Sequence, residues 1–530
     1  MGVLPRALIA GTAVLSLVML LVRARAYWPF TVDDTFITLR YAKHFAEGLG
    51  PTWNPSGPPV EGYTTALWML LLAAPHALGV DALWFAKASG VVFMFATICL
   101  AAALAYELAR ALDPRARRVA ALAPFAVSIA YWPTALHAIS GMETALSALL
   151  LTLFVLVTVR LVRDPARRRM RSVALIALLS VLARPETVVC CGIALIATIA
   201  LVPRDRRKGF GRALSVYLLV PGLAYFAGRY AYFGLVFPLS LYVKATGQAK
   251  LAGLDDVRAF FAPFVLEWPQ LGLLAIYGAV GQRRLVPALL GLLGLVVFFV
   301  YPAHIMGFEG RYLFPTFPTL SALIGVGAAK LAHHALTRIA RLKAVPRADL
   351  VLAALAAIVL AAFMLPRDEP TSRARWIAYG SGMERAHVAL ANALKRAKTS
   401  VVRPTIALLD VGAVAYYSDW YVIDTFGLND ARVALSRRTD VDYVFAQRPE
   451  LVVVVSESPA RFAAVFDWEQ PIYDQALQRG YEPMCSYRFD HDYHLQVLAR
   501  PSSPIREALT CPKIGETSSA ARAELQPSAR

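Results

Sequence analysis

Long apolar runs separated by short basic loops make up most of the chain up to residue 366. The first run, residues 4–22, is apolar apart from Arg6 and matches the roughly 20 residues that a helix needs to cross a bilayer. Further runs of this kind occupy residues 83–109, 119–136, 143–162, 172–183, 187–202, 213–233, 258–280, 285–302, 313–331 and 350–365. With 172–183 and 187–202 counted separately, the pattern predicts an α-helical polytopic membrane protein with about 11 transmembrane helices.

The segment after the first run, residues 23–82, contains two shorter helical patterns. In the first, Ile37, Tyr41 and Phe45 recur at helical spacing, while the polar side chains Arg40, Lys43, His44 and Glu47 share another arc. This pattern is typical of an amphipathic helix that lies in the membrane interface. The second, residues 66–78, is apolar but too short to span easily, which indicates an interfacial or re-entrant helix.

Beyond residue 366 the pattern changes. Residues 405–409 and 451–455 are short apolar runs typical of buried strands, and residues 385–397 have a helical pattern. We therefore expect a small α/β domain over residues 367–511, after a membrane domain over residues 1–366, and a disordered tail over residues 512–530. Cys485 and Cys511 lie in this polar region, where a disulfide is plausible if the region is extracytoplasmic.

Composition and charge support this reading and set the topology. The chain is 58% hydrophobic and 17% charged, with a net charge of +18. Soluble domains have about 25% charged residues. Lys and Arg gather between apolar runs, at residues 110–118, 163–171, 204–212, 283–284 and 338–347. We interpret them as cytoplasmic loops under the positive-inside rule rather than as a nucleic-acid site. The chain then sits in the cytoplasmic membrane, with segment 23–82 and the C-terminal domain extracytoplasmic.

Residues 24–26, Ala-Arg-Ala, resemble a signal-peptidase site, so cleavage after the first run is an alternative. We favour an uncleaved helix, because the polar motif that follows so closely would then remain tethered to the membrane.

The candidate chemistry begins with the adjacent carboxylates Asp33 and Asp34. Adjacent charges repel, which favours protonation of one carboxylate or its pairing with a cation. One aspartate is explained if it caps a helix that begins at Thr35. The other would remain free to accept a proton from a hydroxyl nucleophile or to bind a divalent cation. No His, Cys and Asp cluster has metal-ligand spacing, so a cation at Asp33 and Asp34 stays open and no other cofactor is expected.

Several motifs together resemble the GT-C superfamily of membrane glycosyltransferases. They are Asp33-Asp34 through Arg40-Tyr41-Ala42, Trp53-Asn54-Pro55, Glu61-Gly62-Tyr63-Thr64, Ser140-Gly141-Met142-Glu143-Thr144, Arg184-Pro185-Glu186 and Gly310-Arg311-Tyr312. In order and spacing they are most similar to the terminal arabinofuranosyltransferases of mycobacterial cell walls. The stretches 410–419 and 424–428 extend the resemblance into the C-terminal domain.

The resemblance implies a transferase that uses a polyprenyl-phosphate sugar. An acceptor hydroxyl of a cell-envelope glycan or glycolipid attacks the anomeric carbon at the outer face of the membrane, and arabinofuranosyl transfer is one possibility. We expect Asp33 as the base with Asp34 as its partner, or the two in reversed roles. Arg311, Lys244 and Arg184 are candidates for the donor phosphate. Residues expected around the sugar and acceptor are Arg40, Tyr41, Glu61, Tyr63, Glu309 and Tyr312.

Two other classes of protein compete with this hypothesis. A multi-pass transporter or flippase of lipid-linked sugars would show internal repeats and polar residues near the middle of broken helices. Here the polar residues concentrate at predicted outer ends of spans, with Glu267 among the few exceptions. A non-catalytic envelope scaffold is the third option. For each single cation, an interfacial side chain reaching toward the headgroups is the simpler explanation.

Overall fold

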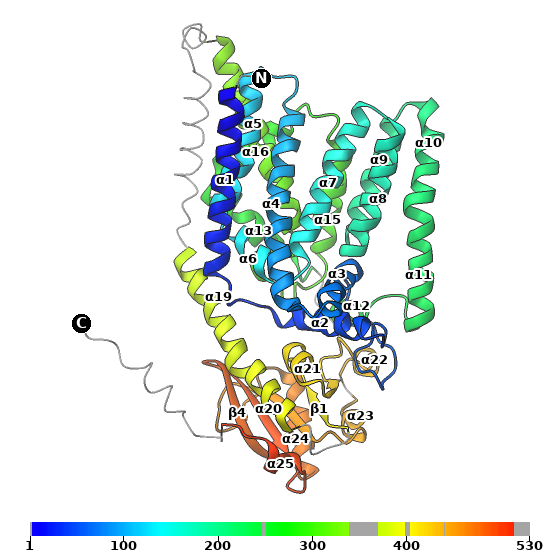
Figure 1. Cartoon of the computed structure of the whole chain (residues 1–530), viewed down its shortest axis with the longest axis vertical. Coiled ribbons are helices and arrows are strands. Elements are labelled where there is room, and N and C mark those ends of the chain that lie inside the picture. Colours follow the sequence, from blue (N-terminus) through cyan, green and yellow to red (C-terminus); the bar gives the residue numbers. More distant parts are fainter. Residues whose placement is uncertain (1–2, 246–250, 339–368, 398–402, 439, 513–530) are drawn as a thin grey trace, which may run out of the picture.

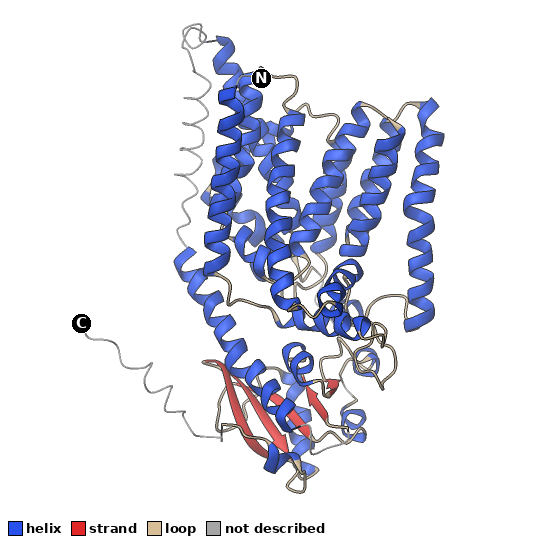
Figure 2. Cartoon of the chain, in the orientation of Figure 1, coloured by secondary structure: helices blue, strands red, loops and turns tan. Residues whose placement is uncertain are grey.

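The computed structural model describes residues 3–245, 251–338, 369–397, 403–438 and 440–512 (Figure 1). The predicted span at 350–365 and nearly all of the predicted tail at 512–530 lie outside these ranges. The described chain forms a bundle of long helices with a smaller α/β domain at one end (Figure 2).

The long helices of the bundle run side by side (Figure 1). They are α1 (Val3–Ala26), α4 (Ala82–Leu108), α5 (Pro114–Ala130), α7 (Thr144–Arg163), α8 (Arg167–Ala183), α9 (Thr187–Leu201), the continuous α10 (Arg204–Leu214), η1 (Ser215–Leu219) and α11 (Val220–Phe233), α15 (Val286–Phe299) and α16 (Phe317–Arg338). Shorter pieces are α6 (Pro133–Ile139), α12 (Leu239–Ala245), α13 (Leu254–Ala262), η2 (Pro263–Glu267), α14 (Pro269–Ala279), η3 (Phe308–Gly310) and η4 (Phe314–Thr316).

The predicted number of membrane spans is not confirmed. Among the described residues, 5 helices are long and apolar enough to cross a membrane, or up to 7 if each of two bent pairs counts as one span. The bends lie between α5 and α6, at 75°, and between residues 254–267 and α14, at 101°. The count of eleven treated every apolar run as one straight span. However, α9 and α15 are shorter apolar helices, which pack against each other.

The basic loops gather at one end of the bundle. The loops between α4 and α5, between α7 and α8, and before α10 lie at the end opposite the α/β domain (Figure 1). Three of the predicted basic loops therefore share one end of the bundle.

The C-terminal domain is built on a five-stranded sheet with strand order β2-β1-β3-β5-β4. Strands β1 (Thr405–Leu408), β2 (Tyr421–Asp424) and β3 (Leu451–Ser456) are parallel, and β4 (Glu482–Asp490) and β5 (Tyr493–Ala499) are antiparallel additions. Its helical pieces are α19 (Glu369–Met383), η5 (Glu384–Val388), α20 (Ala389–Ala397), α21 (Gly412–Ser418), α22 (Ala431–Leu435), α23 (Val441–Ala446), η7 (Asp467–Glu469), α24 (Gln470–Gln478) and α25 (Ile505–Ala508). The two strands expected from the sequence are β1 and β3. The fully buried β3 is apolar up to its last residue, Ser456, whereas β4 is partly exposed and lacks a continuous apolar run.

Helices α2 (Asp33–Ala46) and α3 (Ala66–Ala77) lie between the bundle and the C-terminal domain (Figure 1). We call residues 23–82 the first loop. One hydrophobic cluster contains Phe36 and Trp53 of this loop together with Leu390 and Trp420 of the C-terminal domain. The loop and the domain therefore share a core and form one packed unit.

The polar arc of α2 faces this domain. Arg40 is 1% exposed. Its guanidinium donates to the carbonyls of Trp53 and Trp420, at 2.7 and 2.8 Å, and to that of Ala415. We expected this arc to meet water and lipid headgroups. The sequence pattern marks a polar face, but it cannot say whether water or buried carbonyls satisfy that face.

Asn54 attaches the first loop to the edge of the sheet. Its side-chain amide donates to the Val422 carbonyl at 2.9 Å, and its oxygen accepts from the Val422 N–H at 3.0 Å. Strand β2 is an edge strand, so these bonds satisfy backbone groups that would otherwise be open for pairing.

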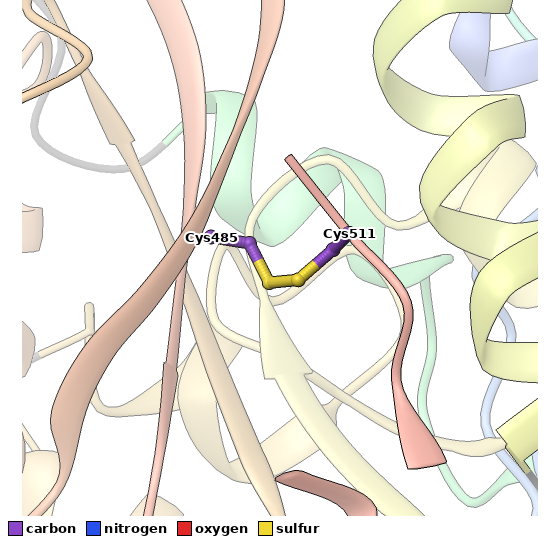
Figure 3. Close-up of a disulfide and its surroundings, with 2 residues drawn as sticks. All are labelled: Cys485 and Cys511. Atoms are coloured by element: carbon purple, nitrogen blue, oxygen red, sulfur yellow. A yellow bond between two sulfur atoms is a disulfide. The ribbon is translucent and has the colours of Figure 1, made fainter. Parts of the chain in front are cut away.

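Cys485 and Cys511 form a disulfide, with a Cα–Cα distance of 5.9 Å (Figure 3). The bond joins β4 to the end of the described chain, as the sequence suggested for an extracytoplasmic domain.

Candidate active site

Asp33 is the first residue of α2, and its carboxylate does not cap that helix. The N-cap position belongs to Val32, and no side chain caps the helix. The expectation that one aspartate caps a helix beginning at Thr35 is therefore wrong. Thr35 already lies within α2, and its hydroxyl donates to the Ser140 carbonyl at 3.0 Å.

The Asp33 carboxylate instead receives two backbone N–H groups of the C-terminal domain. Gly412 and Ala413, at the start of α21, each donate to one of its oxygens at 2.8 Å. A Cβ at Gly412 would lie 2.1 Å from the Asp33 carbonyl oxygen, so only glycine permits this approach. Each carboxylate oxygen keeps a second lone pair for a further hydrogen bond.

Two more groups of the C-terminal domain act on Asp33. His387, in the π-helical turn η5, lies 3.1 Å from an oxygen of Asp410 through its Nε2. The Tyr493 hydroxyl donates to the same oxygen at 2.6 Å. Burial raises the pKa of Asp33 to about 6; the charge of Asp410 adds to this, while His387 and the two N–H groups oppose it. Burial lowers the pKa of His387, but Asp410 and Asp33 outweigh it, so the net pKa is raised.

Asp34 has different surroundings. It is half-buried, and its side chain makes no hydrogen bond or ion pair with the residues that the structure describes. Its charge acts on Tyr379 of α19, whose pKa is raised by burial and by the charges of Asp33, Asp410 and Asp34. Asp34 is thus the carboxylate of the pair that is not used to attach the two domains.

Arg311 is a buried cation that forms no ion pair with the residues that the structure describes, and its Nη2 donates to the Tyr312 hydroxyl at 3.5 Å. It is 4% exposed, and its Nε and Nη1 atoms have no hydrogen-bond partner within the described part of the chain. Its guanidinium carbon lies 4.8 Å from the ring centre of Tyr312 and 5.7 Å from that of Phe308. A buried, unpaired guanidinium is costly, so this site favours the arrival of an anion.

Arg184 has its counterions within the chain. It donates to Glu143 at 2.8 Å and to Glu186 at 2.5 Å, and it lies 4.9 Å from the ring centre of Tyr312. Tyr312 therefore has both guanidinium groups close to its ring.

An aromatic cluster connects the Arg311 segment with the Asp33 segment. The Phe30 ring lies 5.2 Å from Phe308, 5.0 Å from Trp376 and 5.5 Å from Tyr379, measured between centres. Trp376 also donates to a carboxylate oxygen of Glu309 at 2.9 Å. Segments 28–33, 308–312 and 376–379 thus meet at one place, which brings the predicted base and the predicted phosphate ligand into one region.

The other predicted site residues are largely engaged with protein groups. Arg40 donates to carbonyl groups, as described above. The Tyr41 hydroxyl donates to the Val60 carbonyl at 3.0 Å, and the ring centres of Tyr41 and Tyr63 are 4.9 Å apart. Glu61 is ion-paired with Arg229 and borders a pocket of about 200 Å³ lined also by Phe233 and Phe237. Lys244 belongs to α12, but its side chain lies outside the described residues.

The described residues contain no group of three or more His, Cys, Asp or Glu side chains that could hold a metal ion. A cation at Asp33 and Asp34 would therefore have few protein ligands from this part of the chain.

His387 and Asp410 were not among the residues expected from the sequence. Asp410 follows the buried strand β1 and precedes the Gly412 turn, a position where parallel sheets commonly place functional groups. That signal was available in the sequence. No local pattern in the sequence marks His387. Its partners, Asp410 after β1 and Asp33 in segment 23–82, lie far from it along the chain.

The fold of this chain is similar to that of several proteins of known structure. ArnT from Cupriavidus metallidurans bound to undecaprenyl phosphate superimposes with a TM-score of 0.58 at 14% identity, over 94% of this chain and 99% of that one. The oligosaccharyltransferase of Archaeoglobus fulgidus in its apo form gives a TM-score of 0.52 at 10% identity, over 84% of this chain and 70% of that one. Both of these neighbours are GT-C glycosyltransferases. The chain has the GT-C fold.

A third GT-C structure shows a partial likeness. The arabinofuranosyltransferase AftD from Mycobacteria gives a TM-score of 0.54 at 18% identity, over 93% of this chain but only 40% of that one. Residues 376–501 match a family model described as a domain of unknown function, DUF8728. No curated protein matches the sequence.

Proposed function

We propose that this protein transfers a sugar from a polyprenyl-phosphate donor to a hydroxyl of a cell-envelope glycan or glycolipid. The observation that carries the proposal is the likeness, over nearly the whole of both chains, to ArnT bound to undecaprenyl phosphate. The buried guanidinium of Arg311 supports it, because its Nε and Nη1 have no hydrogen-bond partner among the described residues and a lipid phosphate would supply an anion.

Asp33 serves as the base in this reaction. The acceptor oxygen attacks the anomeric carbon, the bond from that carbon to the phosphate oxygen breaks, and its electrons leave with the lipid phosphate. The acceptor proton goes to Asp33. A pKa of about 6 makes this carboxylate a better base near neutral pH than an ordinary aspartate, while leaving most of it ionised. Attack opposite to the leaving phosphate inverts the anomeric configuration.

Charge stabilisation falls to Arg311, supported by Tyr312 and Arg184. Because Glu143 and Glu186 already neutralise Arg184, we assign the direct phosphate contact to Arg311 and a supporting role to Arg184. The pocket beside Glu61 is our candidate for part of the acceptor, since a carboxylate flanked by aromatic rings suits sugar hydroxyls and ring faces.

Our proposal includes a site at the outer face of the cytoplasmic membrane. The basic loops at the far end of the bundle support a cytoplasmic location for that end. The disulfide between Cys485 and Cys511 supports an oxidising compartment for the C-terminal domain.

The test uses purified full-length protein in proteoliposomes, a panel of polyprenyl-phosphate sugars that includes an arabinofuranosyl donor, an extract of envelope glycans and glycolipids as acceptor, and mass spectrometry of the products. We expect transfer from at least one donor, and a loss of about 100-fold or more in Asp33→Asn, in line with the usual worth of a positioned base. Transfer by Asp33→Asn at the wild-type rate, with loss only in Asp34→Asn, would reassign the base to Asp34. Movement of intact donor across the bilayer without product would instead indicate the flippase alternative.

A further inference from the structure

A buried cluster of ionisable groups surrounds Asp33, and the reaction just described uses only Asp33 itself. His387 is 1% exposed, and its Nε2 lies 3.1 Å from Asp410. Tyr493 donates to Asp410, so the carboxylate of Asp410 has two partners from different elements, η5 and β5. All three residues belong to the segment that matches the domain of unknown function.

The backbone around the cluster is locked by close approach. A Cβ at Gly380 would lie 2.3 Å from the Pro29 carbonyl oxygen, and one at Gly412 would lie 2.1 Å from that of Asp33. Helices α19 and α21 therefore rest directly on the chain on either side of Phe30 and Val32. A shift of the domain by a fraction of an ångström would move Asp33 with it.

The charged and titratable groups that face Asp33 come from several packed elements. From the C-terminal domain they are Tyr379 of α19, His387 of η5 and Asp410 after β1; Tyr493 of β5 and Glu469 of η7 interact with Asp410 rather than with Asp33, and Asp34 is the neighbouring carboxylate in the first loop. Lys87 of α4 donates to the carbonyls of Trp28 and Phe30, at 2.6 and 3.0 Å, on the other side of the segment. Among the groups on the C-terminal side, His387 is the one that can carry a positive charge.

We propose that the C-terminal domain completes the active site: His387 and Asp410 are positioning residues that fix the backbone donors of the Asp33 carboxylate, and His387 also balances its charge. The inference rests on the proposed function, since it gives this domain a role in the same transfer. Neither residue touches the substrate. Asp410 orients the His387 ring through Nε2, and it lies two residues before Gly412, whose N–H holds the Asp33 carboxylate together with that of Ala413. The charge of the imidazolium favours the ionised form of both carboxylates, which would otherwise repel each other.

The role predicts a change in pH dependence that simple loosening of the fold would not give. Without His387 the positive charge beside Asp33 is lost, so Asp33 should hold its proton to higher pH. We expect His387→Gln to move the acidic limb of the kcat profile upward by about 1 pH unit or more, with little change in KM for the donor. His494→Gln is the matched control, because His494 is also buried in this domain, on β5, but faces Ser456.

Asp410→Asn and Tyr493→Phe extend the series. Asp410→Asn removes the partner of His387, so we expect a fall in kcat at unchanged donor KM, and Tyr493→Phe should give a smaller fall of the same kind. An acidic limb that stays at the wild-type pH in both His387→Gln and Asp410→Asn would overturn the proposal. If His387→Gln does not fold, the two other variants decide the matter.

A second measurement separates this inference from the proposed function. Thermal unfolding of Asp33→Asn, His387→Gln and the double variant tests their coupling without any substrate. If no donor in the panel is used by the wild type, the proposed function fails while this cycle can still show that Asp33 and His387 act together. Additive shifts in Tm would show that the two residues are independent and would refute the positioning role even in an active enzyme.

Discussion

The Asp33 carboxylate is held in a conformation that favours chemistry over stability. It is buried, close to Asp410, and its pKa is raised from its ordinary value of 3.8 to about 6. Two N–H groups and His387 compensate only in part for the loss of water. Residues under such conflicting demands are frequent at active sites, because a group that the fold satisfies completely has little left to offer a substrate.

This conflict gives a prediction for stability against pH. Below about pH 4 Asp33 is protonated in the folded and unfolded states alike, and its contribution is fully present. As pH rises through about 6 the folded protein must ionise a buried carboxyl that the unfolded chain ionised earlier, so stability is lost, on the order of 2 to 3 kcal/mol. His387, whose pKa is also raised, loses its contribution in the same direction.

The measurement is Tm from intrinsic fluorescence between pH 4 and pH 8, in wild type and Asp33→Asn. The wild type should lose more stability over this range than the variant does. Asp205→Asn, at an exposed carboxylate on α10, is the control and should follow the wild type. Parallel curves for wild type and Asp33→Asn would contradict the assignment of a strained Asp33.

Among single residues, the sequence identified those site candidates that a local pattern marks. Two adjacent aspartates after an apolar run stood out by themselves, and so did Arg311 between Gly310 and Tyr312. The partners of these residues could not be read in the same way. Asp33 accepts a hydrogen bond from Gly412 and interacts with the charge of His387, and both residues are more than 350 positions away. Such interactions depend on how the C-terminal domain packs against α2, so no local pattern predicts them.

At the scale of elements, the contact between α2 and α21 is the joint that positions the site. Arg40 and Asp33 of α2 both bond to backbone groups of α21 or the residues beside it. The helical pattern predicted α2 and α3 well, with α3 within one residue of its expected end. It did not predict that the polar side of α2 would be buried, because a buried arginine with satisfied donors and a solvated one look alike in sequence.

Gly412→Ala tests this joint. The added Cβ would lie 2.1 Å from the Asp33 carbonyl oxygen, and backbone atoms cannot swing aside as a flexible side chain can. We expect a loss of about 1–3 kcal/mol of stability, typical of overpacking, together with at least a 10-fold loss of transfer because Asp33 is displaced. The measurements are Tm and the initial rate of transfer.

Gly228→Ala is the matched control for that variant. Gly228 lies within α11, and a Cβ there would meet nothing within 4 Å. It should leave both Tm and rate near the wild-type values or raise Tm slightly, since alanine favours helix. If Gly412→Ala behaves like this control, the α21 contact does not position the site.

At the scale of the whole molecule, the two hydrophobic clusters divide the chain differently from the sequence boundaries. The largest cluster lies mainly in the bundle but includes Phe30 of the first loop and Trp376 of α19, whereas the second joins the first loop to the C-terminal domain and extends to Leu146 and Leu150 of α7. We therefore propose that residues 23–82 and the domain from residue 369 act as one unit placed on the end of the bundle. A boundary at residue 366 follows the change in composition along the chain, but packing groups segments that are distant in sequence.

This arrangement makes a single prediction about the membrane: the far ends of the bundle and the C-terminal domain lie on opposite faces. Arg206, on α10, has a side chain that is 54% exposed, and Asp492, in the turn between β4 and β5, has one that is 76% exposed. Introduced cysteines at these positions would be open to a membrane-impermeant maleimide. Of the native cysteines, Cys485 and Cys511 are bonded and Cys190 and Cys191 are buried, and labelling of the half-buried Cys99 on α4 is measured in the wild-type background.

In intact spheroplasts we expect Asp492→Cys to be labelled and Arg206→Cys to be labelled only after permeabilisation, with the wild-type chain as the background control. The reason is the positive charge of the loops. If Arg206 were outside, several basic clusters would lie at the outer face, against the positive-inside rule. Labelling of Arg206→Cys alone would reverse the orientation and move the site to the cytoplasmic face. A donor would then have to come from the inner leaflet, and the disulfide would lie in a reducing compartment. Labelling of both positions without permeabilisation would mean that the bundle does not separate the two ends, which is incompatible with its helices as membrane spans.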